Sequence, residues 1–171
     1  PHIERVTADT MGMLATTMNA LALRDGLESV GVPAEVLGAL AIDGVCKPVD
    51  IRRARKLLGN GVVVILAGGT GRPFFTTDTC AALRAAEIGA DALLKGTKVD
   101  GVYDRDPHVH ADAVRYDRLS YQQALAERLG VMDLTAFSMC MDQEIPIVVF
   151  KLEPGSLQAV LRGEDIGTRV E

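Results

Sequence analysis

The sequence predicts an α/β protein in which helices cover both faces of a mostly parallel β-sheet. Short apolar runs rich in β-branched residues alternate along the chain with longer segments of helical periodicity, as strands and helices do in this fold class. Two of the predicted strands end in polar, glycine-bearing loops, where such sheets bind their ligands. A length of 171 residues suits one domain with a sizeable core, and we expect residues 1–171 to form a single domain.

The first predicted helix begins at Thr7 or Asp9, either of which suits an N-cap, and reaches about residue 30. One apolar stripe follows this helix, and we expect its methionines to fill the core. The stripe consists of Met11, Leu14, Ala15, Met18, Leu21 and Ala22. A strand over residues 36–42, a helix over residues 48–58 and a buried strand over residues 62–66 are predicted next.

The second half of the chain continues the alternation. Helices are expected over residues 78–88, 121–129, 133–143 and 154–162, with Ser120 as an N-cap. Strands are expected over residues 91–95, 114–119 and 147–151, and the tail, residues 166–170, is a candidate edge strand. Residues 68–77 and 96–106 both follow predicted strands, so these loops line one crevice if the strands are neighbours.

The composition argues against several classes of protein. A net charge of −5 disfavours nucleic acid as the main partner, and the absence of tryptophan removes a stacking platform for single strands. No apolar run is long enough to span a bilayer, and no segment resembles a signal peptide. Three widely spaced cysteines without a C-x-x-C pair suit reduced thiols. We therefore expect a cytoplasmic protein with neither nucleic acid nor membrane as a partner.

The stretch VVVILAGGTGRPFFTTD, residues 62–78, holds the strongest candidate site. Its strand, glycine turn and helix start aim backbone N–H groups and the positive end of a helix at an anion. Thr70, Thr76 and Thr77 add hydroxyls, and Arg72 adds a planar cation. We call residues 68–77 the glycine–threonine loop. It matches neither the Walker A pattern nor G-x-G-x-x-G, so a phosphate cradle and an ordinary turn both stay open.

Polar residues after the next predicted strand form a second candidate site. Lys98 can neutralise charge on a transferring phosphoryl group, or simply reach solvent. Tyr103 can lie against a base, or cover the edge of the core. Asp104 and Asp106 suit Mg²⁺ or ribose hydroxyls, although an aspartate before Pro107 also suits a turn.

Two further groups of polar residues have simpler interpretations. His108 and His110 form an H-x-H pair without a third ligand at zinc-like spacing, so we expect exposed loop histidines and no metal-ligating residues. Asp9, Asp78 and Asp133 each suit a helix N-cap as well as a functional carboxylate.

Long segments of the chain resemble bacterial UMP kinases, which belong to the amino-acid-kinase superfamily. The resemblance lies in AGGTGRPFFTTDTCAALRAAEIGAD and LLKGTKVDGVYDRDP, and extends to TADTMGMLATTMNALALRDGLE, VMDLTAF and GEDIGTRV. It covers essentially the whole chain, in order. It implies a sandwich-like α/β fold and transfer of the γ-phosphoryl group of ATP, with Mg²⁺, to UMP, giving UDP and ADP in pyrimidine nucleotide biosynthesis.

The resemblance also implies roles for individual residues. Asp9 would bind the ribose of UMP, and the glycine–threonine loop would surround UMP near its phosphate. The loop residues concerned are Thr70, Gly71, Arg72, Pro73, Phe74, Phe75, Thr76 and Thr77. The residues implied for ATP are Thr97, Tyr103 and Asp106. The predicted catalytic set, in which the carboxylates are supporting groups, is Asp78, Asp133 and Lys98.

Members of this family are typically hexamers built from dimers, with GTP as activator and UTP as inhibitor. The resemblance therefore implies a homo-oligomer with these effectors. The predicted helix over residues 7–30 is our candidate for part of the dimer surface, and burial within its own domain is the alternative.

Two other functions remain open. A related kinase with a carboxylate or carbamate acceptor would share the fold, although the threonine-rich loop and Asp9 favour a nucleotide acceptor. A non-catalytic protein that binds nucleotides or oxyanions for storage or regulation is the other alternative, as in molybdenum storage proteins, because a fold alone does not exclude it.

The family's first strand with a Lys-x-Ser-Gly segment, its Gly-Gly-Gly-Asn loop and an arginine that contacts both substrates have no counterpart in this sequence. We therefore expect an N-terminally incomplete fold. Because phosphoryl transfer depends on positioning and charge stabilisation, we expect the 171 residues alone to be a poor or inactive kinase. An isotope assay of UMP phosphorylation measures this, and normal turnover would contradict it.

Overall fold

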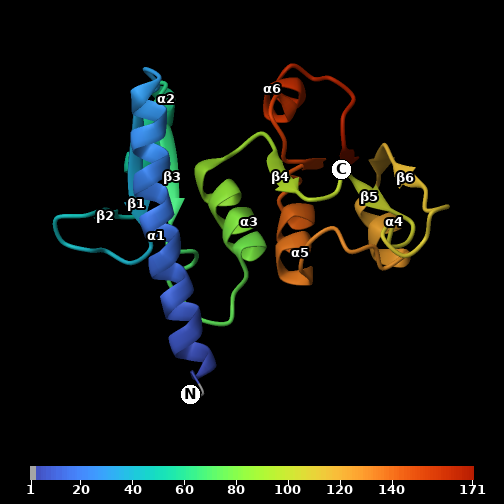
Figure 1. Cartoon of the computed structure of the whole chain (residues 1–171), viewed down its shortest axis with the longest axis horizontal. Coiled ribbons are helices and arrows are strands. Elements are labelled where there is room, and N and C mark those ends of the chain that lie inside the picture. The colour runs from blue at the N-terminus through green and yellow to red at the C-terminus, as the bar shows by residue number, and fades with distance from the viewer. Residues whose placement is uncertain (1–2) are drawn as a thin grey trace. The chain divides into compact units, whose positions relative to one another are not determined.

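The computed structural model describes residues 3–171 and divides the chain into two compact units, Pro1–Cys80 and Ala81–Glu171 (Figure 1). Each unit is described by itself, and the expectation of a single domain stays a prediction. Among the helices of residues 3–171, none combines the length and the apolar character that a membrane crossing requires.

The first unit is a three-stranded parallel sheet with two helices against it. Its elements are α1 (Arg5–Ser29), β1 (Ala34–Gly38), β2 (Lys47–Pro48), α2 (Ile51–Gly59) and β3 (Val63–Ala67). β1 is the central strand and pairs with β2 on one side and with β3 on the other. α1 packs against β1 and β3, and α2 packs against β3 (Figure 1). The three strands thus end at one edge, where the loop after β3 begins.

The N-terminus of α1 differs from its prediction. α1 begins at Arg5, and Glu4 occupies the N-cap position without a side-chain capping hydrogen bond. Neither Thr7 nor Asp9 therefore caps the helix. The carboxylate of Asp9 is left to make contacts outside α1.

The burial of α1 also differs from its prediction. The face of α1 that is buried carries the small residues Thr17 and Ala20, which let the helix approach the sheet closely. Met11 and Met18 are exposed, with 71% of Met18 accessible to solvent. The prediction that these methionines fill the core is wrong. The core of the first unit consists instead of small residues of α1 and of strand residues such as Leu37.

The second unit contains a four-stranded sheet in the order β4-β8-β9-β7 and a two-stranded antiparallel sheet of β5 and β6. α3 (Thr77–Ile88) begins in the first unit and continues into the second. The elements that follow it are β4 (Leu93–Thr97), β5 (Val102–Tyr103), β6 (Arg115–Tyr116), β7 (Arg118–Leu119), α4 (Tyr121–Ala126), α5 (Leu134–Asp142), β8 (Ile147–Lys151), α6 (Ser156–Leu161) and β9 (Thr168–Val170). β4 is parallel to β8, whereas β9 is antiparallel to β8 and parallel to β7. The prediction that the tail forms an edge strand is wrong, because β9 pairs on both sides.

The strand predicted over residues 114–119 is in fact two strands that belong to different sheets. β6 pairs with β5, and β7 pairs with β9. The fully buried Thr168 connects the two sheets: its Oγ1 accepts a hydrogen bond from the N–H of Val102 over 2.8 Å and donates one to the carbonyl of Tyr116. Asp117 is the single residue between these two strands.

The hydrophobic core of the second unit is larger than that of the first. Ile147 and Cys140 are fully buried, and the rings of Tyr121 and Phe137 meet edge to face with centroids 5.1 Å apart. Burial raises the pKa of Cys140 to about 11, so this thiol stays protonated at neutral pH. Ser120 caps α4 as predicted, through a 3.0 Å bond from the N–H of Gln123. The predicted α/β fold with parallel strands is confirmed.

Gly163 and Gly167 form a matched pair that tests the packing beside β8. Both have left-handed φ angles, 76° and 81°. A Cβ on Gly167 would lie 2.2 Å from the carbonyl oxygen of Val149, whereas a Cβ on Gly163 would meet nothing within 4 Å. We expect Gly163→Ala to lower the free energy of unfolding by about 1 kcal/mol, from backbone strain alone. Gly167→Ala should lower it by about 1–3 kcal/mol more, from steric overlap. Urea unfolding measures both variants, and equal losses would contradict this packing.

Candidate functional site

The glycine–threonine loop connects β3 to α3 and packs against Ala39, the residue that follows β1. Gly68 and Gly71 have left-handed φ angles of 80° and 74°. A Cβ on Gly68 would lie 3.3 Å from the nitrogen of Ala39, and one on Gly71 would lie 3.2 Å from its carbonyl oxygen. Glycine tolerates both the backbone conformation and the close approach, so these two glycines determine the path of the loop.

α1 holds this loop at two points. Thr16 Oγ1 accepts a hydrogen bond from the N–H of Gly68 over 2.9 Å, and Asp9 Oδ2 accepts one from the N–H of Phe74 over 2.7 Å. Phe74 has a φ of 71°, a left-handed conformation that costs a residue with a side chain about 1–2 kcal/mol. The bond to a charged carboxylate helps to stabilise this conformation.

The remaining N–H groups determine what the loop can bind. The N–H of Gly71 donates to the carbonyl of Gly68 over 3.0 Å, and the N–H of Arg72 donates to Thr70 Oγ1 over 3.2 Å, so both bond within the loop. In the part of the chain that the structure describes, four N–H groups of the loop have no hydrogen-bond partner, and they belong to Gly69, Thr70, Phe75 and Thr77. The expectation that the loop offers N–H groups to an anion therefore applies to part of the loop, because the rest is used to hold its shape.

The loop ends at the N-terminus of α3. Thr76 Oγ1 accepts a hydrogen bond from the N–H of Thr79 over 3.0 Å, which is the bond of a helix N-cap. Asp78 lies inside the first turn of α3 and is not its cap. The positive end of this twelve-residue helix therefore adjoins the loop.

A pocket of about 260 Å³ lies between α1 and the loop. The residues of α1 that line it recur about once per helical turn, and so share one face of the helix. They are Ala8, Asp9, Gly12, Met13 and Thr16. The loop contributes Gly69, Thr70, Arg72, Phe75, Thr76 and Thr77. Most of the residues predicted for UMP are thus gathered around one pocket.

The charge of Asp9 is maintained by its hydrogen bonds. The N–H of Phe74, and after it the guanidinium of Arg5, lower the pKa of Asp9 below its ordinary value. Arg5 Nε donates to Asp9 Oδ1 over 2.7 Å. Because the pKa is lowered, these bonds contribute stability above the ordinary pKa of an aspartate, and the contribution is lost as the pH falls through the lowered pKa.

A second pocket, of about 580 Å³, lies in the second unit beyond the carboxyl end of β4. Thr97, Tyr103 and Asp106, the three residues predicted for ATP, all line it. Lys95 also lines this pocket, whereas Lys98 is not among its described lining residues. The predicted nucleotide contacts of the second unit are therefore gathered in one place.

Hydrogen bonds hold the loop that borders this second pocket. The hydroxyl of Tyr103 donates to Asp100 Oδ1 over 2.7 Å, which lowers the pKa of Asp100 and raises that of Tyr103. Asp106 Oδ1 accepts from the N–H of His108 over 2.8 Å and starts a turn, as its position before a proline suggested. His108 and His110 are exposed, and residues 3–171 contain no group of three or more His, Cys, Asp or Glu side chains placed to hold a metal ion.

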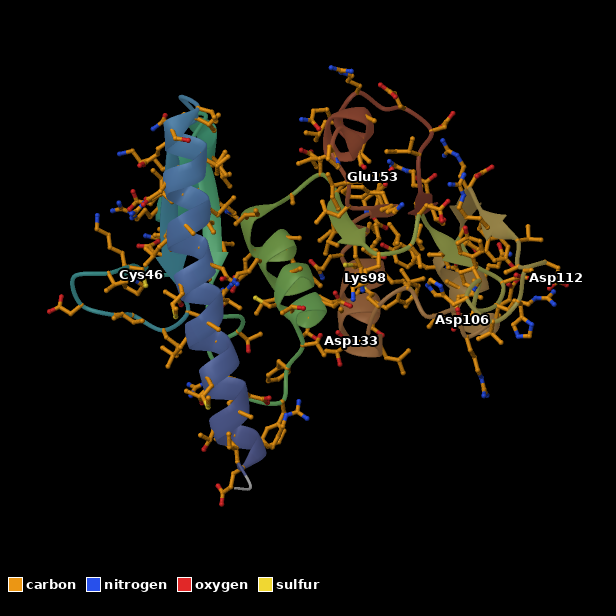
Figure 2. All side chains as sticks on the ribbon, viewed as in Figure 1. Cys46, Lys98, Asp106, Asp112, Asp133 and Glu153 are labelled. Atoms are coloured by element: carbon orange, nitrogen blue, oxygen red, sulfur yellow. The ribbon has the colours of Figure 1, made fainter. Side chains whose placement is uncertain are left out.

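The predicted catalytic set lies in three different elements. Asp78 lies in the part of α3 that belongs to the first unit. Lys98 follows β4 and Asp133 precedes α5, both in the second unit (Figure 2). Asp133 Oδ1 accepts from the N–H groups of Thr135 and Ala136 over 3.0 and 3.1 Å, so Asp133 is the N-cap of α5. The catalytic roles of all three stay predictions, as does a crevice shared by the two loops.

The sequence model of the amino acid kinase family matches residues 1–151. The chain belongs to the amino acid kinase family. Among curated relatives, the uridylate kinase of Xanthomonas euvesicatoria pv. vesicatoria is 54% identical over 170 residues, which are 99% of this chain and 71% of the relative. The uridylate kinase of Dichelobacter nodosus is 53% identical over 169 residues, which are 98% of this chain and 70% of the relative.

Solved structures agree with the family assignment. The crystal structure of UMP kinase from Bacillus anthracis superposes with a TM-score of 0.95 at 37% identity, over 99% of this chain and 70% of that one. UMP kinase from Ureaplasma parvum gives a TM-score of 0.94 at 38% identity, over 99% of this chain and 73% of that one. The resemblance to bacterial UMP kinases that the sequence predicts is confirmed.

Some residues of this amino acid kinase contribute to the site without having been predicted. Thr16 holds the start of the loop, Gly12 lines the pocket, and Arg5 pairs with Asp9. Arg5, Asp9, Gly12 and Thr16 recur at intervals of three or four, which places them on one face of α1. That spacing is the signal in the sequence from which they were predictable once Asp9 was assigned to the site.

Gly12 of this amino acid kinase provides a test that separates stability from binding. A Cβ at this position would meet nothing within 4 Å. We expect Gly12→Ala to raise the free energy of unfolding by about 1 kcal/mol, because alanine favours the helix. Gly12→Leu keeps the helix propensity but extends into the pocket, so the dissociation constant of UMP should rise about tenfold or more. Calorimetric titration and urea unfolding measure both effects. Unchanged UMP affinity in Gly12→Leu would contradict the prediction that this pocket binds UMP.

Proposed function

We propose that this chain carries the acceptor site of a kinase that transfers the γ-phosphoryl group of ATP to UMP, giving UDP and ADP. One observation carries the proposal: the glycine–threonine loop borders a pocket and retains N–H groups without a partner among the described residues. The relatives named uridylate kinase, at 54% and 53% identity, support UMP as the acceptor.

In this proposal the loop binds the phosphate of UMP. N–H groups at Gly69 and Thr70 provide hydrogen bonds, and the guanidinium of Arg72, which lines the pocket, provides positive charge. The positive end of α3 adds to this field. Because these groups are already in place, the acceptor phosphate is oriented without reorganising the loop, and orientation is the main contribution a protein makes to phosphoryl transfer.

Asp9 binds the ribose of UMP in this proposal. Each of its two carboxylate oxygens accepts one hydrogen bond from the protein, from Phe74 N–H and from Arg5 Nε. A carboxylate has about four acceptor positions, so both oxygens retain capacity for ribose hydroxyls. The same side chain thus links the sugar to the loop that holds the phosphate.

ATP occupies the second pocket in this proposal, where it contacts Thr97, Tyr103 and Asp106. The described residues hold no acidic cluster able to bind a metal ion alone, which suits Mg²⁺, since this ion is bound mainly by substrate phosphates and one or two carboxylates. Three carboxylates line the pocket, those of Asp104, Asp106 and Glu127, and Asp106 is the one that we propose to contribute. Bound Mg²⁺ supplies charge neutralisation at the phosphates.

Three residues remain proposed for the chemical step. Lys98 follows β4 and would neutralise charge that develops on the transferred group. Asp78 and Asp133 would act as supporting carboxylates. For Asp133 this role is compatible with capping α5, because a carboxylate accepts several hydrogen bonds.

The exposed apolar residues of α1 support the proposal of a homo-oligomer. Met11, Leu14 and Met18 are exposed, and an apolar stripe on a long helix is typical of a surface that another protein chain covers. We propose a dimer through α1 as part of a hexamer. Regulation by GTP and UTP and a cytoplasmic location stay predictions.

The acceptor is tested by calorimetric titration of the chain with UMP, aspartate and glutamate. UMP should bind, whereas the amino acids, which would be the acceptors of a related kinase, should not. Arg72→Gln should weaken UMP binding about tenfold or more, through loss of a charge-assisted contact to phosphate. The matched control is Arg118→Gln, which removes an exposed arginine paired with Glu171 and should leave UMP binding unchanged.

Phosphoryl transfer is tested separately, on the product of the gene that contains this sequence. An isotope assay should detect UDP formation from UMP and ATP. Binding of UMP without any turnover would favour a non-catalytic storage or regulatory protein. Binding of aspartate or glutamate in place of UMP would overturn the proposed acceptor.

A further inference from the structure

Arg5 contacts both partners in the hydrogen bond that holds the far end of the glycine–threonine loop. Its Nε donates to Asp9 Oδ1 over 2.7 Å, and Asp9 Oδ2 in turn accepts from the N–H of Phe74. The guanidinium carbon of Arg5 also lies 5.7 Å from the centroid of the Phe74 ring, within the range of a cation–π interaction. One side chain thus touches the residue that accepts the bond and the residue that donates it.

The position of Arg5 is unfavourable for α1 itself. Arg5 is the first residue of the helix, where a cation opposes the positive end of the helix dipole. The pair Arg5–Asp9 also has the basic residue on the N-terminal side, which is the weaker order for an i,i+4 ion pair. A residue that conflicts with its local structure is typical of a functional position. Helix stability therefore does not explain this arginine.

Its contacts suggest a different role. Phe74 is held in a left-handed conformation and is 64% exposed, so packing of the core does not hold it there. Arg5 orients the carboxylate of Asp9 through one oxygen, which leaves the other directed at the N–H of Phe74. Its guanidinium also lies over the Phe74 ring, within the range of a cation–π interaction. Both contacts favour the same conformation of the loop.

We propose that Arg5 is a positioning residue for the acceptor nucleotide, which acts through Asp9 and Phe74 to hold the glycine–threonine loop in its binding conformation. The inference rests on the proposed function, because it assigns the consequence to UMP. Arg5 does not touch the phosphate in this account. It determines how much of the time the loop presents its N–H groups at the pocket.

The test compares Arg5→Met, Arg5→Lys and the control Arg24→Met in ¹⁵N-labelled protein. Arg24 lies on the same helix and also pairs with an aspartate, Asp25, but its bonds do not reach the loop. The first measurement, without nucleotide, is the chemical shift and hydrogen exchange of the Phe74 N–H. The N–H of Gly68, which Thr16 holds, is the internal reference. The second measurement is UMP affinity by calorimetric titration.

We expect the Phe74 N–H in Arg5→Met to exchange faster and to shift upfield, while that of Gly68 is unchanged. The dissociation constant of UMP should rise about fivefold, as expected for loss of one exposed cation–π and charge contact. Arg5→Lys, which keeps the charge but not the planar group, should be intermediate. Arg24→Met should match the wild type. The melting temperature of Arg5→Met should change little, because losing the bond to Asp9 offsets the removal of a cation from the helix N-terminus.

Two results would overturn the inference: an unchanged Phe74 N–H in Arg5→Met, or UMP affinity equal to that of the wild type. A similar loss of affinity in Arg24→Met would also overturn it, since the effect would then be one of net charge. Failure of the wild-type chain to bind UMP would instead overturn the proposed function and the assignment to UMP. The Phe74 N–H would still decide whether Arg5 holds the loop.

Discussion

Two hydrogen bonds that the glycine–threonine loop donates to α1 are the constraint on which the proposed acceptor site depends. Thr16 holds the loop where it leaves β3, and Asp9 holds it at Phe74. α1 suits this task because it is a single helix of 25 residues that packs on the sheet through Thr17 and Ala20. Without these bonds the glycines would leave the loop many conformations, and a ligand would have to order them on binding.

Each of the two units forms a pocket, but different contacts hold the loop that borders it. In the first, a long helix holds a flexible loop from outside through side chains. In the second, short strands and turns shape the pocket: Tyr103 bonds to Asp100, Asp106 starts a turn, and Thr168 connects two sheets. Because residues 97–106 run along one edge of the second pocket, the three contacts predicted for ATP are gathered by local chain geometry.

The sequence predicts elements well where a local pattern determines them. β8 is found over the predicted residues, and the glycines after β3 form the predicted turn, since both depend on neighbouring residues. The exposure of Met18 and the central place of β9 were not predictable in the same way. Periodicity identifies an apolar face but not what covers it, and strand pairing depends on residues far apart in the chain.

The residues of the candidate site divide in the same way, into those that a local pattern predicts and those that depend on contacts between distant parts of the chain. The Gly68–Thr77 segment was recognisable from its own residue types. The residues next to Asp9 in the sequence did not determine its role, because the same sequence pattern suits an N-cap and a functional carboxylate. Its partner Phe74 is 65 positions away, and only the fold brings the two together. Arg5 was missed for the same reason.

We propose that α1 holds the loop so that some of the loop's N–H groups remain available to a phosphate. The most direct measurement is a titration of ¹⁵N-labelled protein with UMP and, separately, with uridine, which lacks the phosphate. The account predicts that UMP shifts the N–H signals of Gly69, Thr70, Phe75 and Thr77 much more than uridine does, while Gly68 and Phe74 stay bonded to α1. Equal shifts with both ligands, or release of Gly68 and Phe74 on binding, would contradict it.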